Sequence, residues 1–180
     1  MRQELLQLFF ATAIDNFETY IVSIIREILK KKPQILRTRE QNLTVEYVLQ
    51  FESIQELTNE IIEGKVNSLS YEGFSALQEW CTKKQLPLAV PTDIRETIEE
   101  LIATRNTIVH NRGRIDDKYL RTVRNSKFRK GDKRKIETDD YFGAEQMLHS
   151  IVRTTDEAAV AKYTLETFPL HKDVGWFDIK

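Results

Sequence analysis

The stretch that decides the fold is residues 2–31, which read RQELLQLFFATAIDNFETYIVSIIREILKK. Its apolar side chains recur at intervals of three and four, which is the period of one face of an α-helix. Lys30 and Lys31 suit the negative C-terminal end of such a helix, and Pro33 prevents its continuation. The pattern therefore predicts one long amphipathic helix, whose apolar face needs other elements to cover it.

The rest of the chain predicts shorter helices, placed by their caps and breakers. Ser53 and Glu56 have the spacing of a capping box, Ser70 and Thr92 are candidate N-caps, and Gly113 is a candidate stop. With the apolar periodicity, these signals predict a short turn over 45–51 and helices over 53–64, 71–84, 92–111, 116–123 and 138–163.

The composition agrees with a helical protein. Only 6 Gly and 4 Pro occur in 180 residues, too few for a fold with many tight turns. We expect an all-α bundle of about five to six helices, forming a single domain over 1–180. Within it we distinguish a core over 1–125, a basic loop over 126–137, and a C-terminal helix with a docking tail over 138–180.

Charge and cysteine content exclude several classes of protein. The formal net charge of −1 excludes a globally basic nucleic-acid binder. Cys81 is the single cysteine, so an intramolecular disulfide and a cysteine-rich zinc site are both excluded. Glu4, Asp15 and Glu18 interrupt the apolar residues of the first helix, which argues against a signal sequence or membrane span. We expect a cytoplasmic protein without a membrane partner.

The strongest functional hint is the run from Ala103 to Gly113, ATRNTIVHNRG. On a helical wheel Arg105 falls near the centre of the apolar face, where a cation needs a buried acid or a cleft. Asn106 and His110 share a neighbouring polar strip, whereas Arg105 and His110 point about 140° apart on a straight helix. A guanidinium and an imidazole together supply what metal-free cleavage of an RNA phosphodiester requires.

This run resembles the Arg-x4-6-His motif of HEPN (higher eukaryotes and prokaryotes nucleotide-binding) domains. The matching features are an arginine, a polar residue directly after it, and a histidine five positions on, at the end of a helix in a small all-α protein. The phrase Arg105 to Asn111 and its lead-in from Ile98 are typical of larger HEPN proteins of bacterial defence and toxin systems.

The resemblance implies a homodimer in which two motifs face one composite cleft, with metal-independent endoribonuclease activity and no cofactor. Arg105 and His110 would be the catalytic pair and Asn106 the polar assistant. The role implied is that of a toxin or antiviral effector, with an antitoxin or defence-system protein as a possible partner. HEPN toxins silenced by nucleotidyltransferases carry a tyrosine two positions after the histidine, where this chain has Arg112, so an antitoxin would have to act by another route.

A basic run follows the motif. Residues 112–135 hold eleven basic and three acidic side chains, an arrangement suited to RNA phosphates and to salt-dependent binding. The alternative is a solvated, mobile loop. The candidate RNA-binding residues are Asn111, Arg112, Arg114, Lys127, Arg129, Lys130, Lys133, Arg134 and Lys135.

Three further interpretations remain open. Arg105 is alternatively a buried structural arginine paired with Glu18, Asp15 or another acid, with His110 and Asn111 simply capping the helix end. A HEPN-like fold is alternatively a non-catalytic module that binds RNA, nucleotide or protein through the same surface. Residues 168–177 are too apolar for a solvated tail, so we expect part of them to dock on the bundle or on a partner chain. No spacing of histidines or acids predicts a metal site.

Overall fold

The computed structural model describes residues 2–38 and 42–166. Within these ranges the regular elements are helical and no strand occurs apart from one isolated bridge. The all-α prediction is therefore confirmed, with more helices than expected. They are α1 (Gln3–Lys31), α2 (Val45–Val48), α3 (Ile54–Glu72), α4 (Phe74–Lys83), α5 (Arg95–Asn111), α6 (Asp117–Thr122) and α7 (Thr138–Tyr163), with 3-10 helices η1 (Pro33–Leu36) and η2 (Thr92–Ile94).

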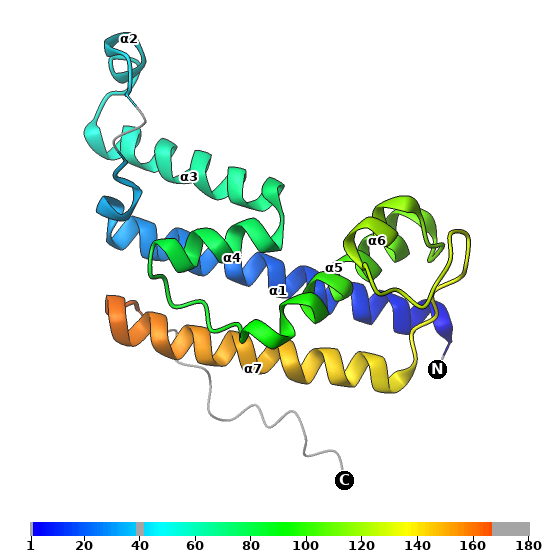
Figure 1. Cartoon of the computed structure of the whole chain (residues 1–180). Coiled ribbons are helices and arrows are strands. Elements are labelled where there is room, and N and C mark those ends of the chain that lie inside the picture. Colours follow the sequence, from blue (N-terminus) through cyan, green and yellow to red (C-terminus); the bar gives the residue numbers. More distant parts are fainter. Residues whose placement is uncertain (1, 39–41, 167–180) are drawn as a thin grey trace.

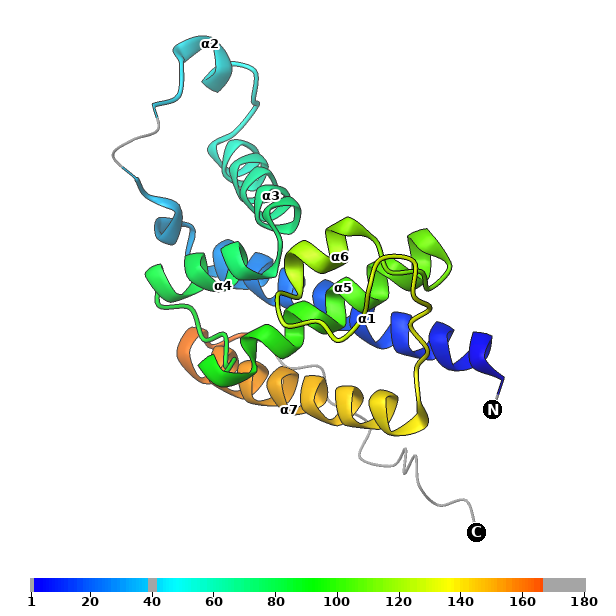
Figure 2. The ribbon, with the colours of Figure 1, turned by 45° about the vertical axis from the view of Figure 1, so that its right-hand side comes forward.

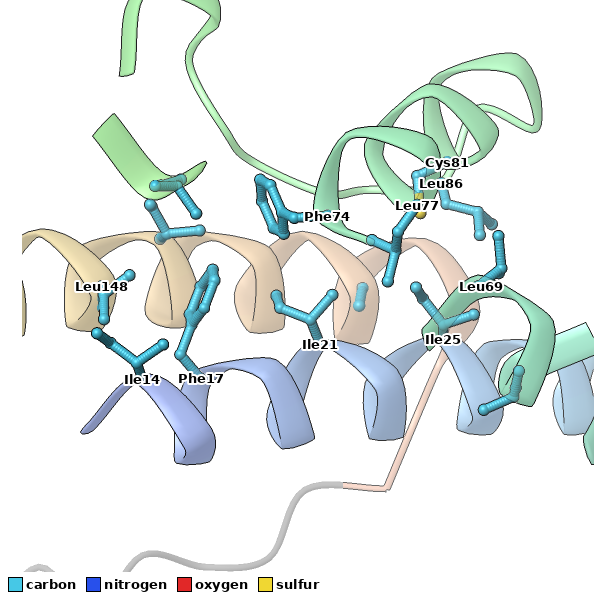
Figure 3. Close-up of a cluster of buried hydrophobic side chains, with 14 of the residues drawn as sticks. Ile14, Phe17, Ile21, Ile25, Leu69, Phe74, Leu77, Cys81, Leu86 and Leu148 are labelled. Carbon is cyan, nitrogen blue, oxygen red and sulfur yellow. The ribbon is translucent and has the colours of Figure 1, made fainter. Parts of the chain in front are cut away.

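Helix α1 forms the centre of the bundle, and α7, α3 and α5 pack along it (Figure 1). Its buried side chains lie on one face, as the apolar spacing predicted. Full burial of one such side chain contributes about 1.5–3 kcal/mol, so this face is the main source of stability. Figure 3 shows part of the core, with labels on Ile14, Phe17, Ile21, Ile25, Leu69, Phe74, Leu77, Cys81, Leu86 and Leu148.

By length and composition alone, α1 is also long and apolar enough to cross a membrane. In the folded chain its apolar face is covered by α7, α3 and α5. A long core helix of a globular bundle has the same length and composition as a membrane span, so this similarity does not identify a membrane protein.

Two predicted boundaries between helices are wrong. Helix α3 does not end at Gly64 but continues to Glu72, because Val66 and Leu69 extend its buried face. The break lies instead at Gly73, whose φ of +87° favours glycine and which caps α4 in place of Ser70. Similarly, the fifth helix begins three residues later than expected, because Thr92–Ile94 forms a 3-10 turn.

Helix α6 and the basic loop after it cover the end of the bundle beside the start of α1 (Figures 1 and 2). A second small cluster holds them there, in which Tyr119 and Ile115 are buried against Ala103 of α5. The backbone of the loop also pairs with residues 113–115, for example through Arg134 N–H donating to the Gly113 carbonyl at 2.8 Å. The backbone of the loop is thus anchored to the end of the bundle, while most of its side chains are exposed to solvent.

Candidate functional site

The candidate site lies on the last two turns of α5, which ends where the sequence predicted. Arg112 caps the helix in the left-handed conformation, and Gly113 follows with a φ of +77°. The Gly113 N–H donates to the Thr107 carbonyl at 3.0 Å, which closes the helix end. A Cβ atom on Gly113 would lie 3.2 Å from Gln7 Nε2, so α1 packs tightly against this turn.

Arg105 makes two contacts through different atoms of its guanidinium. Its Nε lies 2.5 Å from Asp15 Oδ1 on α1, in an ion pair whose angle is not that of a hydrogen bond. Its Nη1 donates to Asn106 Oδ1 at 2.8 Å. The side chain of Arg105 is 24% exposed and that of Asp15 is 42% exposed. The guanidinium is thus anchored at one edge and still accessible to solvent, and its Nη2 makes no hydrogen bond or ion pair with another described residue.

Asn106 links Arg105 to the side of the helix that carries His110. On a regular helix Asn106 and His110 lie about 40° apart, whereas Arg105 and His110 lie about 140° apart. The hydrogen bond to Asn106 directs the guanidinium of Arg105 toward the side of the helix that carries His110. His110 itself is exposed and makes no hydrogen bond or ion pair with any residue in the described ranges. The fold joins Arg105 to Asn106 by a hydrogen bond, whereas His110 is hydrogen-bonded to neither of them.

A second carboxyl group lies next to the Asp15–Arg105 pair. Glu18 is one turn after Asp15 on α1 and is half-buried. Burial raises the pKa of Glu18 above its ordinary value of 4.5, Arg105 lowers it in part, and Asp15 raises it further. Three ionisable groups from two helices therefore interact at this point. A phosphate group bound nearby would add a negative charge to these electrostatic interactions.

The candidate RNA-binding residues divide into anchored and accessible groups. Asn111 donates to Asp116, the N-cap of α6, and Lys130 lies 2.6 Å from Asp117. Arg134 stacks over the Phe128 ring and pairs with Asp140, so its side chain is only 15% exposed. These three residues stabilise the end of the bundle. The accessible group is Arg112, Arg114, Lys127, Arg129, Lys133 and Lys135, all of which are exposed.

Asp116 is held in its charged form by its capping role. It accepts the Tyr119 N–H at 2.8 Å and also the amide of Asn111. The Tyr119 N–H in particular lowers the pKa of Asp116. The hydrogen bond from Asn111 also fixes the end of α5 to the start of α6. The sequence analysis had named Asn111 as a candidate RNA-binding residue and had not predicted this contact.

Neither of the two main grooves coincides with the motif. One, of about 460 Å³, lies between α1 and α7 and includes Phe9, Asn16 and His149. The other, of about 730 Å³, lies between α7 and the segment that precedes α5. Arg105, Asn106 and His110 line neither of these two grooves.

Asp15 lies outside the motif, but the sequence analysis named it with Glu18 as a possible partner of Arg105, and the structure pairs Arg105 with Asp15. The apolar position of Arg105 on the helical wheel predicted the need for an acid, whereas the choice between the two acids depends on how α1 and α5 pack. Among the described residues, no group of three or more potential ligands is arranged to hold a metal ion. No family model matches this chain, and no curated protein or solved structure is significantly similar to it.

Proposed function

We propose that this protein is a metal-independent endoribonuclease of the HEPN type, acting as a homodimer in toxin or antiviral defence. The observation that carries the proposal is the hydrogen bond from Arg105 Nη1 to Asn106, which turns the guanidinium toward the strip shared with His110. All three side chains are accessible to solvent at the same helix end.

The reaction uses one proton donor and acceptor and one fixed cation. The imidazole of His110 takes the proton from a ribose 2′-OH, whose oxygen attacks the adjacent phosphorus. The Nη2 and Nη1 N–H groups of Arg105 donate to the phosphorane oxygens as negative charge develops there. The bond to the 5′-oxygen breaks and that oxygen takes up a proton, which leaves a 2′,3′-cyclic phosphate and a 5′-hydroxyl.

Exposed apolar side chains beside the motif support the homodimer. Val109, one turn after Arg105, is 50% exposed, and Leu8, which shares a face of α1 with Asp15, is 59% exposed. Because α1 and α5 run in roughly opposite directions (Figures 1 and 2), both lie on the same side of the Asp15–Arg105 contact. A second copy covering this surface would remove apolar area from water and bring two motifs together.

The accessible basic residues support RNA as the substrate. Arg112 and Arg114 follow His110 directly, and Lys133 lies opposite Arg114 in the isolated bridge. These three side chains are exposed and face away from the bundle core. Contacts with RNA phosphates through such residues give binding that weakens steeply with salt.

The ion pair of Arg105 with Asp15 favours a second candidate function. An arginine held by an acid of a neighbouring helix also serves simply to join α5 to α1. The chain would then be a non-catalytic HEPN-like module that binds RNA, nucleotide or a partner protein, including an antitoxin or defence-system protein.

The decisive experiment is RNA cleavage in excess chelator by the wild-type chain, Arg105→Ala and His110→Ala. Chelator-resistant cleavage that both substitutions abolish, with the helical circular dichroism spectrum unchanged, supports the nuclease. As a matched control, His149→Ala changes an exposed histidine of α7 and leaves cleavage intact. Binding without cleavage by the wild-type chain selects the non-catalytic module.

Mixing the two inactive variants tests the composite cleft. If Arg105 of one copy acts with His110 of the other, a random mixture of Arg105→Ala and His110→Ala recovers about a quarter of wild-type activity, because half of the dimers keep one intact site. If the pair acts within one chain, or if the protein is a monomer, the mixture stays inactive.

A further inference from the structure

We propose that residues 167–180 bind back onto their own chain, in the groove between α7 and the segment 88–94. This groove has a volume of about 730 Å³. Its floor is apolar and its rim is polar. The groove is open at Gly143 of α7, where an added Cβ atom would have no other atom within 4 Å. It is lined by Leu88, Ala89, Val90, Pro91, Ile94, Gly143, Gln146, Met147, Ser150, Ile151 and Thr154.

The chain leaves α7 in a direction that suits this binding. Thr164 adopts the left-handed conformation with φ of 52° and ψ of 50°, so the helix ends there and the backbone turns. Leu165 then packs against the main core rather than pointing into solvent. The residues directly before 167 therefore already follow the surface of the bundle.

The turn lies beside one end of the segment that forms the far wall of the groove. Lys162 Nζ donates to the Gln85 carbonyl at 2.6 Å. The chain then runs along α7, and its residues 88–91 line the groove together with residues of α7. The Ala89 N–H donates to Thr155 Oγ1 at 3.0 Å, which fixes this wall to the helix. A chain emerging after Leu165 thus starts near the end of a preformed channel.

The length of the segment is sufficient to fill it. Along the α7 axis, Thr154 lies about 14 Å and Gly143 about 30 Å from Tyr163, at 1.5 Å per residue. The fourteen residues from 167 to 180 span up to about 46–50 Å when extended. They can therefore reach every residue that lines the groove, including the far end at Gly143.

The composition of the segment matches the chemistry of the groove. Six of the fourteen side chains are large and apolar, and the groove lining carries no charge. Gln146 and Ser150 on the rim are exposed and have side chains without hydrogen-bond partners in the described part of the chain, so they remain open to a bound backbone. The large apolar residues of the segment are Phe168, Leu170, Val174, Trp176, Phe177 and Ile179.

Fluorescence of Trp176 tests the proposal in the full-length chain. Substitution Trp80→Phe leaves Trp176 as the only tryptophan. We expect its emission to be blue-shifted and its quenching by acrylamide to be several-fold weaker than in urea. Gly143→Phe places a ring in the open part of the groove and restores strong quenching. Gly64→Phe, at a helical glycine of α3 that also has nothing within 4 Å, leaves the protection unchanged.

Three results would overturn the proposal. The first is quenching of Trp176 by acrylamide that is as strong in the native chain as in urea. The second is protection from quenching that Gly143→Phe does not reduce. The third is protection from quenching that disappears when the protein is diluted. The last outcome would mean that the segment occupies a second copy. Should Trp80→Phe unfold the chain, the signal of Trp176 follows from the difference between the wild-type chain and Trp176→Phe, and the same outcomes apply.

Discussion

The ion pair between Asp15 and Arg105 yields a prediction that tests the candidate site without an activity assay. Two unit charges about 4 Å apart attract by about 4 kcal/mol at an effective dielectric constant of about 20 and by about 1 kcal/mol in water. The two side chains are 42% and 24% exposed, so solvent screens much of the larger figure. After the cost of ordering both side chains, we expect a coupling free energy of about 1 kcal/mol.

The assay is a double-mutant cycle on the free energy of urea unfolding, with Asp15→Ala, Arg105→Ala and both together at pH 7. The coupling should fall as salt is raised from low to about 0.5 M, because exposed charges are screened. Arg153 and Glu157, an exposed pair within α7 at 3.9 Å, serve as the control, with an expected coupling of about 0.3–0.5 kcal/mol. A coupling for Asp15 and Arg105 below that of this control would mean that α1 does not hold the guanidinium, and our description of the site would be wrong.

Three further predictions concern stability and are measured by urea unfolding. Ile98→Ala removes a side chain of 0% exposure and should cost about 2–5 kcal/mol. Gly113→Ala should cost more than Gly131→Ala, because both glycines have positive φ but an added methyl group at Gly113 would lie 3.2 Å from Gln7 Nε2 and 3.3 Å from the Arg134 carbonyl oxygen, whereas one at Gly131 meets nothing within 4 Å; equal costs would contradict the close packing. Glu18→Gln should stabilise the chain at pH 7, with the gain vanishing below about pH 4.5. A raised pKa means that the folded state binds more protons than the unfolded state, so wild-type stability falls as pH rises through that window, and a gain independent of pH would refute this.

The arrangement of the long helices could be predicted where the apolar pattern is continuous. The spacing over residues 2–31 gave the central helix to within one residue of α1, and Asn111 was correctly expected to end α5. The boundary between α3 and α4 was missed because Gly64 was taken as a stop. A glycine inside a helix costs only about 1 kcal/mol, which the burial of Val66 and Leu69 outweighs.

The site was predictable only in its local part. Arg105, Asn106 and His110 belong to one helix, so their angular relation follows from sequence spacing. The position of Asp15 opposite Arg105 depends on how α1 and α5 cross, which no local pattern encodes. For the same reason the sequence did not predict the contacts of Asn111 with Asp116 and of Arg134 with Asp140, which form only in the folded chain.

A conservative substitution separates a catalytic Arg105 from a structural one. The ion pair engages Nε and the hydrogen bond engages Nη1, so the structural contacts use only part of a guanidinium with five N–H donors. Arg105→Lys keeps the positive charge beside Asp15 but loses the planar fork. If Arg105 only joins the two helices, this variant should keep most of the coupling to Asp15 and all of any activity. If the fork binds the phosphorane, the same variant should remain folded with a stability near that of the wild-type chain, while chelator-resistant cleavage falls by about 10²-fold or more. Full activity in a folded Arg105→Lys protein would therefore remove Arg105 from the reaction.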